Sequence, residues 1–231
     1  MVIMNNMKSL LRKQLNKHIT LWTKKEIIYH TIIGIFFLTT GILLTYFANI
    51  YTKGYTGGVV SDILLDNLPV MNVGVVFFQG SFIFLLCLVA ALLFEPKYIP
   101  FTLESTGLFF LVRSIFTMMT HLSAPSVEYY NYIIKYGHDA HSVMFTLSSG
   151  NDLFFSGHAG YPFLLALIFW RLKYFRYFFL LCSIVGSIAV ILGHLHYTID
   201  VFSAFFIAFG IIEIAKRLFK KEYTLLNTQH L

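Results

Sequence analysis

Six long apolar runs, separated by short polar stretches, constrain what this 231-residue chain can fold into. Apolar residues make up 57% of the sequence and charged residues only 12%, about half the charged fraction of a soluble domain. So much apolar surface cannot be hidden from water in one core of this size, so we expect the lipid bilayer to be the solvent. The runs predict an all-α membrane protein, a bundle of six transmembrane helices.

The predicted spans cover residues 27–50, 73–94, 101–120, 157–170, 177–192 and a last run from just after His196 to about 219. The fourth span is short unless residues 153–155 extend it. We therefore divide the chain into a basic N-terminal segment (1–26), a six-span domain (27–219) and a tail (220–231). The N-terminal segment has spaced apolar positions, so it is either an amphipathic helix on the membrane surface or a frayed basic tail.

The placement of the 17 Lys and Arg residues predicts the orientation of the spans. They cluster before the first span, after the second, between the fourth and fifth, and after the sixth. The loops on the opposite side carry only Lys53 and Lys135. Basic residues flank spans on the cytoplasmic side of membrane proteins, so we expect both termini in the cytoplasm. Nucleic-acid binding is disfavoured, because no basic stripe interleaved with aromatic residues occurs in a polar domain.

A histidine and an aspartate, His196 and Asp200, lie in a short polar stretch on the predicted non-cytoplasmic side. They are four residues apart and share one face if the last span is helical from this point. A carboxylate that contacts one imidazole nitrogen fixes the tautomer and leaves the other nitrogen free as a base or nucleophile. Taken alone, the pair is more often an incidental polar patch at a helix end.

A second polar stretch on the same side ends in Ser156, Gly157 and His158. Ser156 can cap the fourth helix, Gly157 lets an anion approach the backbone, and the first-turn N–H groups favour phosphate. His158 could then donate a proton to a leaving oxygen. The alternative is an ordinary serine cap followed by a histidine at headgroup depth.

Arg113 lies inside the third span, where a charge exposed to lipid is costly, so we expect it to face an internal cavity. A phosphate oxygen would suit its guanidinium group. The alternative is a structural ion pair with one of three aspartates, Asp62, Asp152 or Asp200. Glu104 and Glu213 lie nearer the cytoplasmic ends of their spans and are interpreted as interfacial or helix-pairing groups.

These motifs together resemble the sphingomyelin synthase family, which belongs to the wider lipid phosphate phosphatase (PAP2) superfamily. The resemblance rests on Arg113-Ser114, on Asp152-Leu-Phe-Phe-Ser-Gly-His158 and on His194-Leu-His-Tyr-Thr-Ile-Asp-Val201, and it covers roughly residues 60–215. It implies a catalytic triad of His158, His196 and Asp200 on the outer or luminal face. It also implies that Arg113, Ser156 and Gly157 bind the phosphate.

The resemblance implies a lipid phosphotransferase that moves a phospho-headgroup from a glycerophospholipid to the hydroxyl of ceramide or diacylglycerol. By that analogy His196 forms a phosphohistidine, Asp200 orients its ring, and His158 protonates the departing alcohol and then deprotonates the acceptor. The partners are a phospholipid donor, a lipid-alcohol acceptor and the bilayer of a plasma, inner or Golgi-type membrane. A homo-oligomer is compatible with the sequence.

Three alternatives stay open. The first is a lipid phosphate phosphatase with the same chemistry and water as acceptor; the absence of a Lys-x6-Arg-Pro motif favours the synthase branch. The second is a non-catalytic lipid-binding protein of the same fold. A transporter fits less well, because the polar groups gather at one face and not at the bilayer midplane.

The headgroup is left open by Leu195, which stands where members that handle choline or ethanolamine carry an acidic residue. An apolar side chain cannot pair with an ammonium group. The candidate headgroup contacts are therefore Asp152, Leu195 and Tyr197, and Asp139 or Glu128 could take the acidic role. We expect no metal or other cofactor, because His194 and His196 have no third ligand at an evident spacing.

Overall fold

The computed structural model describes residues 2–55, 57–126 and 153–227, and within these ranges the secondary structure is entirely helical. The fold class predicted from the sequence, all-α, is confirmed. Eight α-helices lie in the described ranges: α1 (Val2–Trp22), α2 (Lys25–Lys53), α3 (Ser81–Phe94), α4 (Ile99–Met119), α7 (Gly157–Ile168), α8 (Lys173–Leu192), α9 (Thr198–Leu218) and α10 (Lys220–Asn227). Short helical turns are η1 (Leu65–Asn67), the π-helical η2 (Val76–Gly80) and η3 (Pro96–Tyr98).

Five helical stretches in the described ranges are long and apolar enough to cross a membrane, as expected for a multi-pass membrane protein. They are Lys25–Thr52, Val76–Phe94, Pro96–Met119, Lys173–Leu192 and Thr198–Leu218. The helix at the fourth predicted span, α7, has only 12 residues, about 18 Å against a hydrocarbon core of about 30 Å. Residues 153–155 do not extend α7, because the helix begins after its Ser156 cap.

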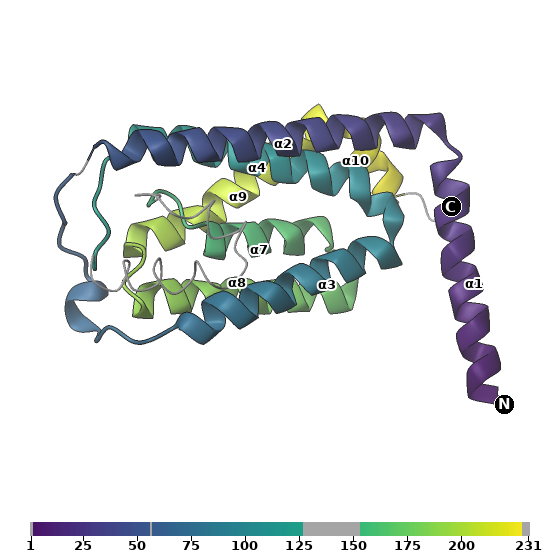
Figure 1. Ribbon diagram of the computed structural model, residues 1–231, viewed down its shortest axis with the longest axis horizontal. Helices are drawn as coiled ribbons and strands as arrows, with labels where there is room; N and C mark the ends of the chain where they lie inside the picture. Colours follow the sequence, from purple (N-terminus) through teal and green to yellow (C-terminus); the bar gives the residue numbers. More distant parts are fainter. Residues whose placement is uncertain (1, 56, 127–152, 228–231) are drawn as a thin grey trace.

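Six helices run alternately between the two ends of the bundle: α2, α3, α4, α7, α8 and α9 (Figure 1). The α2 helix lies along α4, and α7 packs against both α8 and α9. Gly107 of α4 allows α2 and α4 to approach closely, because a Cβ atom at this position would lie 2.5 Å from the carbonyl carbon of Phe37 on α2. Small residues at such contacts are typical of helix pairs in membranes.

The helices differ in how much of their surface they bury. The span of α4 is the most buried of the five long ones, and α2, α3 and α8 bury the smallest shares of their residues. The buried residues of α4 include polar ones, among them Thr102, Glu104, Arg113 and Thr117. Polar side chains that face the inside of a bundle avoid the cost of contact with lipid.

The N-terminal helix α1 runs across the end of the bundle at which α2 begins (Figure 1). It contacts the end of α3, where Lys17 pairs with Glu95 at 2.7 Å and a ring nitrogen of His18 lies 2.9 Å from the carbonyl oxygen of Leu93. The segment is thus helical, as one of the two interpretations of the sequence expected. Its placement on a membrane surface stays a prediction.

Candidate active site

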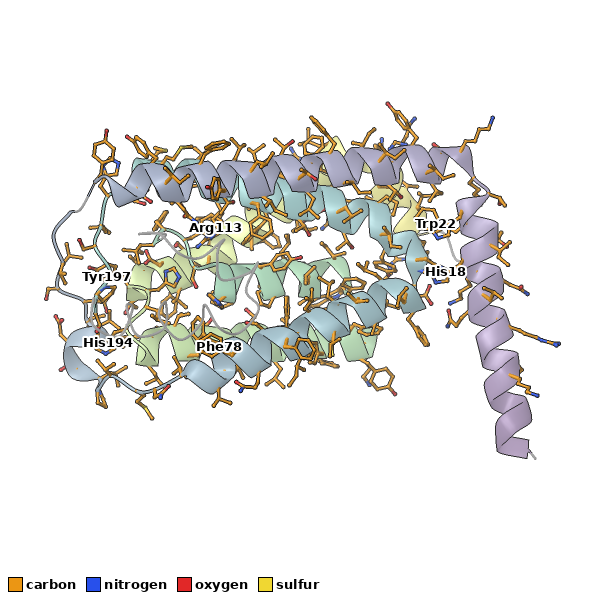
Figure 2. All side chains as sticks on the ribbon, viewed as in Figure 1. His18, Trp22, Phe78, Arg113, His194 and Tyr197 are labelled. Atoms are coloured by element: carbon orange, nitrogen blue, oxygen red, sulfur yellow. The ribbon has the colours of Figure 1, made fainter. Side chains whose placement is uncertain are left out.

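The polar stretches singled out in the sequence meet at the end of the bundle where α4 ends and where α7 and α9 begin. Figure 2 shows Arg113, His194 and Tyr197 toward this end, away from His18 and Trp22 at the other. The segments are joined by hydrogen bonds: the Ser156 N–H donates to the carbonyl oxygen of Asp200 at 3.0 Å. Residues that are distant in the sequence are therefore fixed to one another through the backbone.

His196 is held by one ring nitrogen. Its Nδ1 lies 2.9 Å from the carbonyl oxygen of Leu153 and 3.3 Å from Oδ2 of Asp200. Both neighbours are acceptors, so the network assigns the proton to Nδ1. In the neutral ring the other nitrogen, Nε2, then carries the lone pair, and it has no hydrogen-bond partner among the described residues. An imidazole in this state can act as a nucleophile or a base.

Asp200 is kept in place by the helix that it begins. It is fully buried, and its Oδ2 also accepts a hydrogen bond from the N–H of Tyr197 at 3.1 Å, at the start of α9. One carboxylate oxygen thus caps the helix and orients His196. The i, i+4 relation predicted for His196 and Asp200 is present, with the carboxylate at the helix N-terminus, where negative charge is favoured.

The first turn of α7 has the cap expected from the sequence, since Oγ of Ser156 accepts the N–H of Ala159 at 3.4 Å. The ring of His158, in the same turn, packs on Phe77 of the π-helical turn η2, with centroids 4.4 Å apart. On its other side α8 approaches the backbone of His158 so closely that a Cβ atom at Gly186 would lie 2.5 Å from the His158 carbonyl oxygen.

Arg113 reaches this turn from α4 and is 6% exposed. Its Nε donates to the carbonyl oxygen of Phe155 at 3.1 Å, and a Cβ atom on Gly157 would lie 3.2 Å from the same Nε. The guanidinium group therefore lies against the start of α7. This places four of the predicted site residues around one helix N-terminus.

The ion-pair alternative for Arg113 is not formed with two of its three candidates. Within the described ranges no ion pair joins Arg113 to Asp62 or Asp200, and both carboxylates are bonded elsewhere. The third candidate, Asp152, lies outside the described residues, as do Asp139 and Glu128.

Asp62, which the sequence suggested only as a possible ion-pair partner of Arg113, holds the start of α9. One of its carboxylate oxygens accepts the Thr198 N–H at 2.7 Å, and the other accepts the Thr198 hydroxyl. Burial alone would raise the pKa of Asp62, but the hydrogen bonds from Thr198 and from the N–H groups of Leu64 and Leu65 lower it below its ordinary value. The loop that contains Asp62 has the composition of a turn, but no local pattern in the sequence joins Asp62 to Thr198, which are 136 positions apart.

The loop from Gly57 to Met71 braces the His194–Asp200 stretch at further points. His194, which adopts a φ of 49°, has Nε2 3.1 Å from the Leu68 carbonyl oxygen. Beside Asp62 and Thr198 the surface has an open depression of about 400 Å³, with a mostly apolar lining of which Val60, Leu122, Ile199 and Phe202 are part.

Two predicted headgroup contacts have structural surroundings of their own. Leu195 is 7% exposed and belongs to the hydrophobic core. The hydroxyl of Tyr197 donates to the Ser123 carbonyl oxygen at 2.9 Å and accepts the Val60 N–H at 3.3 Å. Contact of these residues with a headgroup stays a prediction.

Part of the chain that forms this site matches a known protein family. Residues 149–217 match the family model described as PAP2 superfamily C-terminal. This match supports a relationship between the chain and the PAP2 superfamily. The PAP2 match contains the Ser156–His158 turn and the His196–Asp200 pair, and Arg113 and Asp62 lie before it. No curated protein matches the chain. The match suggests phosphatase- or phosphotransferase-type chemistry on lipids.

Proposed function

We propose that the protein is a lipid phosphotransferase of the sphingomyelin synthase type, which moves a phospho-headgroup from a glycerophospholipid to the hydroxyl of ceramide or diacylglycerol. The observation that carries the proposal is the state of His196. Its Nδ1 is bonded to the Leu153 carbonyl and to Asp200, so that Nε2 is left as a free electron pair. This atom is the nucleophile.

In the first half-reaction Nε2 of His196 attacks the donor phosphorus. A P–N bond forms, the P–O bond to diacylglycerol breaks, and the departing oxygen takes a proton from protonated His158. The positive charge that develops on the His196 ring is stabilised by Asp200, which is 3.3 Å from Nδ1. Arg113 and the N–H groups at the start of α7 stabilise the charge on the phosphoryl oxygens.

In the second half-reaction the acceptor hydroxyl gives its proton to His158, and its oxygen attacks the phosphorus. The P–N bond breaks, and His196 is returned to its starting state. Because His158 gives a proton to the departing diacylglycerol and then takes one from the acceptor hydroxyl, it changes protonation state once in each half-reaction. The ring of His158 lies in the first turn of α7, against Phe77, and the negative charge of a bound phosphate favours the protonated ring that the first half-reaction needs.

The proposal includes a topology of six membrane crossings with both termini in the cytoplasm and the site on the outer or luminal face. The alternating course of α2, α3, α4, α7, α8 and α9 supports it, as does the placement of Lys and Arg. The short helix α7 completes its crossing inside the bundle, where Leu164, Leu165 and Ala166 are fully buried and the helix needs little contact with lipid.

The phosphatase alternative differs only in the acceptor of the second half-reaction. The match to the PAP2 superfamily fits both reactions equally. The apolar depression beside Thr198 favours transfer, because an apolar surface next to the site suits a lipid acceptor better than water.

The test is to give the purified protein a glycerophospholipid with a labelled phospho-headgroup, with and without ceramide or diacylglycerol. Transfer predicts a new labelled lipid that needs the acceptor. Release of the labelled phospho-headgroup alone in both reactions would identify a hydrolase. Turnover that is the same in His196→Ala and in the unchanged protein would remove His196 from the chemistry, and no turnover in either would favour the non-catalytic alternative.

A further inference from the structure

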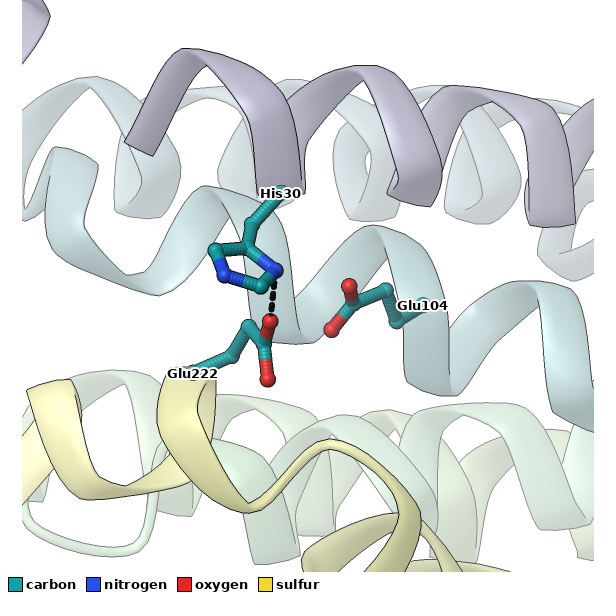
Figure 3. A group of neighbouring side chains, drawn as sticks. All are labelled: His30, Glu104 and Glu222. Carbon is teal, nitrogen blue, oxygen red and sulfur yellow. Dashed lines mark ion pairs between the residues drawn. The ribbon is translucent and has the colours of Figure 1, made fainter. Parts of the chain in front are cut away.

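A second group of ionisable side chains lies far from the candidate active site, toward the other end of the bundle. It consists of His30 on α2, Glu104 on α4 and Glu222 on α10, which point toward one another in Figure 3. All three are buried, with exposed fractions of 9%, 1% and 4%. Glu104 was interpreted from the sequence as an interfacial or helix-pairing group, but its burial excludes an interfacial position.

The two carboxylates of this cluster are poorly compensated. Nδ1 of His30 pairs with Oε1 of Glu222. Both oxygens of Glu104 are buried and have no hydrogen-bond partner among the residues that the structure describes. No Lys or Arg in the described part of the chain forms an ion pair with either glutamate. A buried, unpaired carboxylate costs several kcal/mol or more, so a compensating positive charge is expected beside it.

The three side chains are arranged so that one cation could compensate both carboxylates. One ligand atom from each residue lies within 4.8 Å of those of the other two. Ligands of a tetrahedral ion at about 2.1 Å are about 3.4 Å apart, so small side-chain rotations would bring all three to bonding distance. Glu104 also points to a missing ligand, because its buried oxygens have no hydrogen-bond partner in the described part of the chain and face His30 and Glu222 (Figure 3).

We propose that His30, Glu104 and Glu222 bind a divalent transition-metal ion. One imidazole and two carboxylates are a donor set of borderline and hard character, which suits Zn²⁺ or Mn²⁺ better than a thiolate-preferring ion. The remaining positions on the metal would be taken by water. From the sequence we expected no metal or other cofactor, because His194 and His196 have no third ligand at an evident spacing, and the proposed site departs from that expectation. This cluster lies elsewhere, and no motif spacing joins residues 30, 104 and 222.

The proposed metal ion has a structural role, because it joins the helices α2, α4 and α10. Glu222 lies on the eight-residue helix α10, which already contacts α4 through the rings of Tyr223 and Phe101, 5.4 Å apart. The site is not part of the proposed chemistry, since Glu104 and Arg113 are nine residues apart on α4, about 14 Å along the helix. The metal therefore fastens α10 to α2 and α4.

The first test is the metal content of the purified full-length protein, prepared with an affinity tag that lacks histidine and measured by elemental mass spectrometry. The proposal predicts about one equivalent of Zn²⁺ or Mn²⁺ per chain, and loss of most of it in Glu104→Gln. The matched control is Glu213→Gln, a half-exposed glutamate of α9 that pairs with Lys216 and should leave the metal content unchanged. Equal metal content in Glu104→Gln and the unchanged protein would overturn the proposal.

A second measurement needs no variant. A chelator should lower the thermal unfolding midpoint of the unchanged protein by several degrees, and added Zn²⁺ or Mn²⁺ should restore it. If a shared proton compensates the cluster instead, the protein carries no stoichiometric metal and the midpoint does not respond to chelator. That result would overturn the proposal even if Glu104→Gln failed to fold.

Discussion

At the scale of single residues, the site depends on how closely the Arg113 guanidinium can approach the first turn of α7. That approach is possible because residue 157 has no side chain: a Cβ atom there would lie 3.2 Å from Nε and 3.5 Å from Cζ of Arg113. The same absence leaves the N–H groups of the turn open to an anion. Charge and close backbone approach are therefore combined at one point.

Gly157→Ala should displace the guanidinium group by a few tenths of an ångström and partly cover the N–H groups. We expect turnover of the phospholipid donor to fall about tenfold, which corresponds to about 1.4 kcal/mol of transition-state stabilisation. The control is Gly58→Ala, because a Cβ atom at Gly58 would meet nothing within 4 Å. Unchanged turnover in Gly157→Ala would show that the approach of Arg113 to this turn does not matter.

Arg113→Lys should keep the positive charge but lose both the bond from Nε to the Phe155 carbonyl and the planar fork that suits phosphate oxygens. We expect the turnover rate to fall about 100-fold, by analogy with the removal of one oxyanion donor. Arg176→Lys is the matched control. Arg176 lies in the first turn of α8, over the ring of Trp170, and Trp170 is in the loop between α7 and α8. A fall of less than twofold in Arg113→Lys would remove the fork from the mechanism.

At the scale of elements, the start of α9 is held by a loop that belongs to the other half of the chain. Asp62 accepts both the N–H and the hydroxyl of Thr198 and so fixes the helix that carries Asp200. The N-terminal turns of α7 and α9 are joined in turn by the bond from Ser156 to Asp200. The geometry of His196 therefore depends on a loop outside the matched family region.

Asp62→Asn should lower the thermal stability of the protein, because an amide gives up the charge-assisted bonds to Thr198. The folded-state pKa of Asp62 is lowered, so its contribution is present above its unfolded pKa of about 4 and is lost as the pH falls through the folded value. The difference in unfolding midpoint between the two proteins should therefore be constant from pH 8 to 6 and shrink below pH 4.

Asp66→Asn provides the comparison for this measurement. Asp66 lies in the same loop, but its carboxylate bonds are to Ser61 and Asp62 and not to α9. Asp62→Asn should reduce turnover more than Asp66→Asn does at pH 7. Equal effects of the two substitutions would mean that Asp62 does not position α9.

Most of the helices, and one contact of the candidate site, could be predicted from local patterns in the sequence. The apolar runs predicted five spans within a few residues, and the short fourth run was visible as such before α7 was seen to have 12 residues. The His196–Asp200 relation followed from helical spacing. The role of Asp62 and the cluster around Glu104 could not be predicted, because they depend on contacts between distant elements and not on a local pattern.

At the scale of the whole molecule, the proposed topology requires α7 to complete a crossing although it is short. Single cysteines introduced into a variant without Cys87 and Cys182 can test this with a membrane-impermeant maleimide on intact cells that carry the protein in the plasma membrane. Val59→Cys, in an exposed loop near the site, should be labelled from outside. Lys173→Cys, exposed after α7, should be labelled only after permeabilisation. Labelling of both from outside would contradict six crossings.

The central claim is that His196 carries the phospho-headgroup between donor and acceptor. The most direct measurement is to mix the purified protein with a phospholipid labelled in its phospho-headgroup, without acceptor, and to quench within milliseconds to seconds. We predict an acid-labile, base-stable label on the peptide that contains His196, which is lost on addition of ceramide or diacylglycerol and absent in His196→Ala. Turnover of the donor without any labelled protein, or with a label that persists in His196→Ala, would contradict the account.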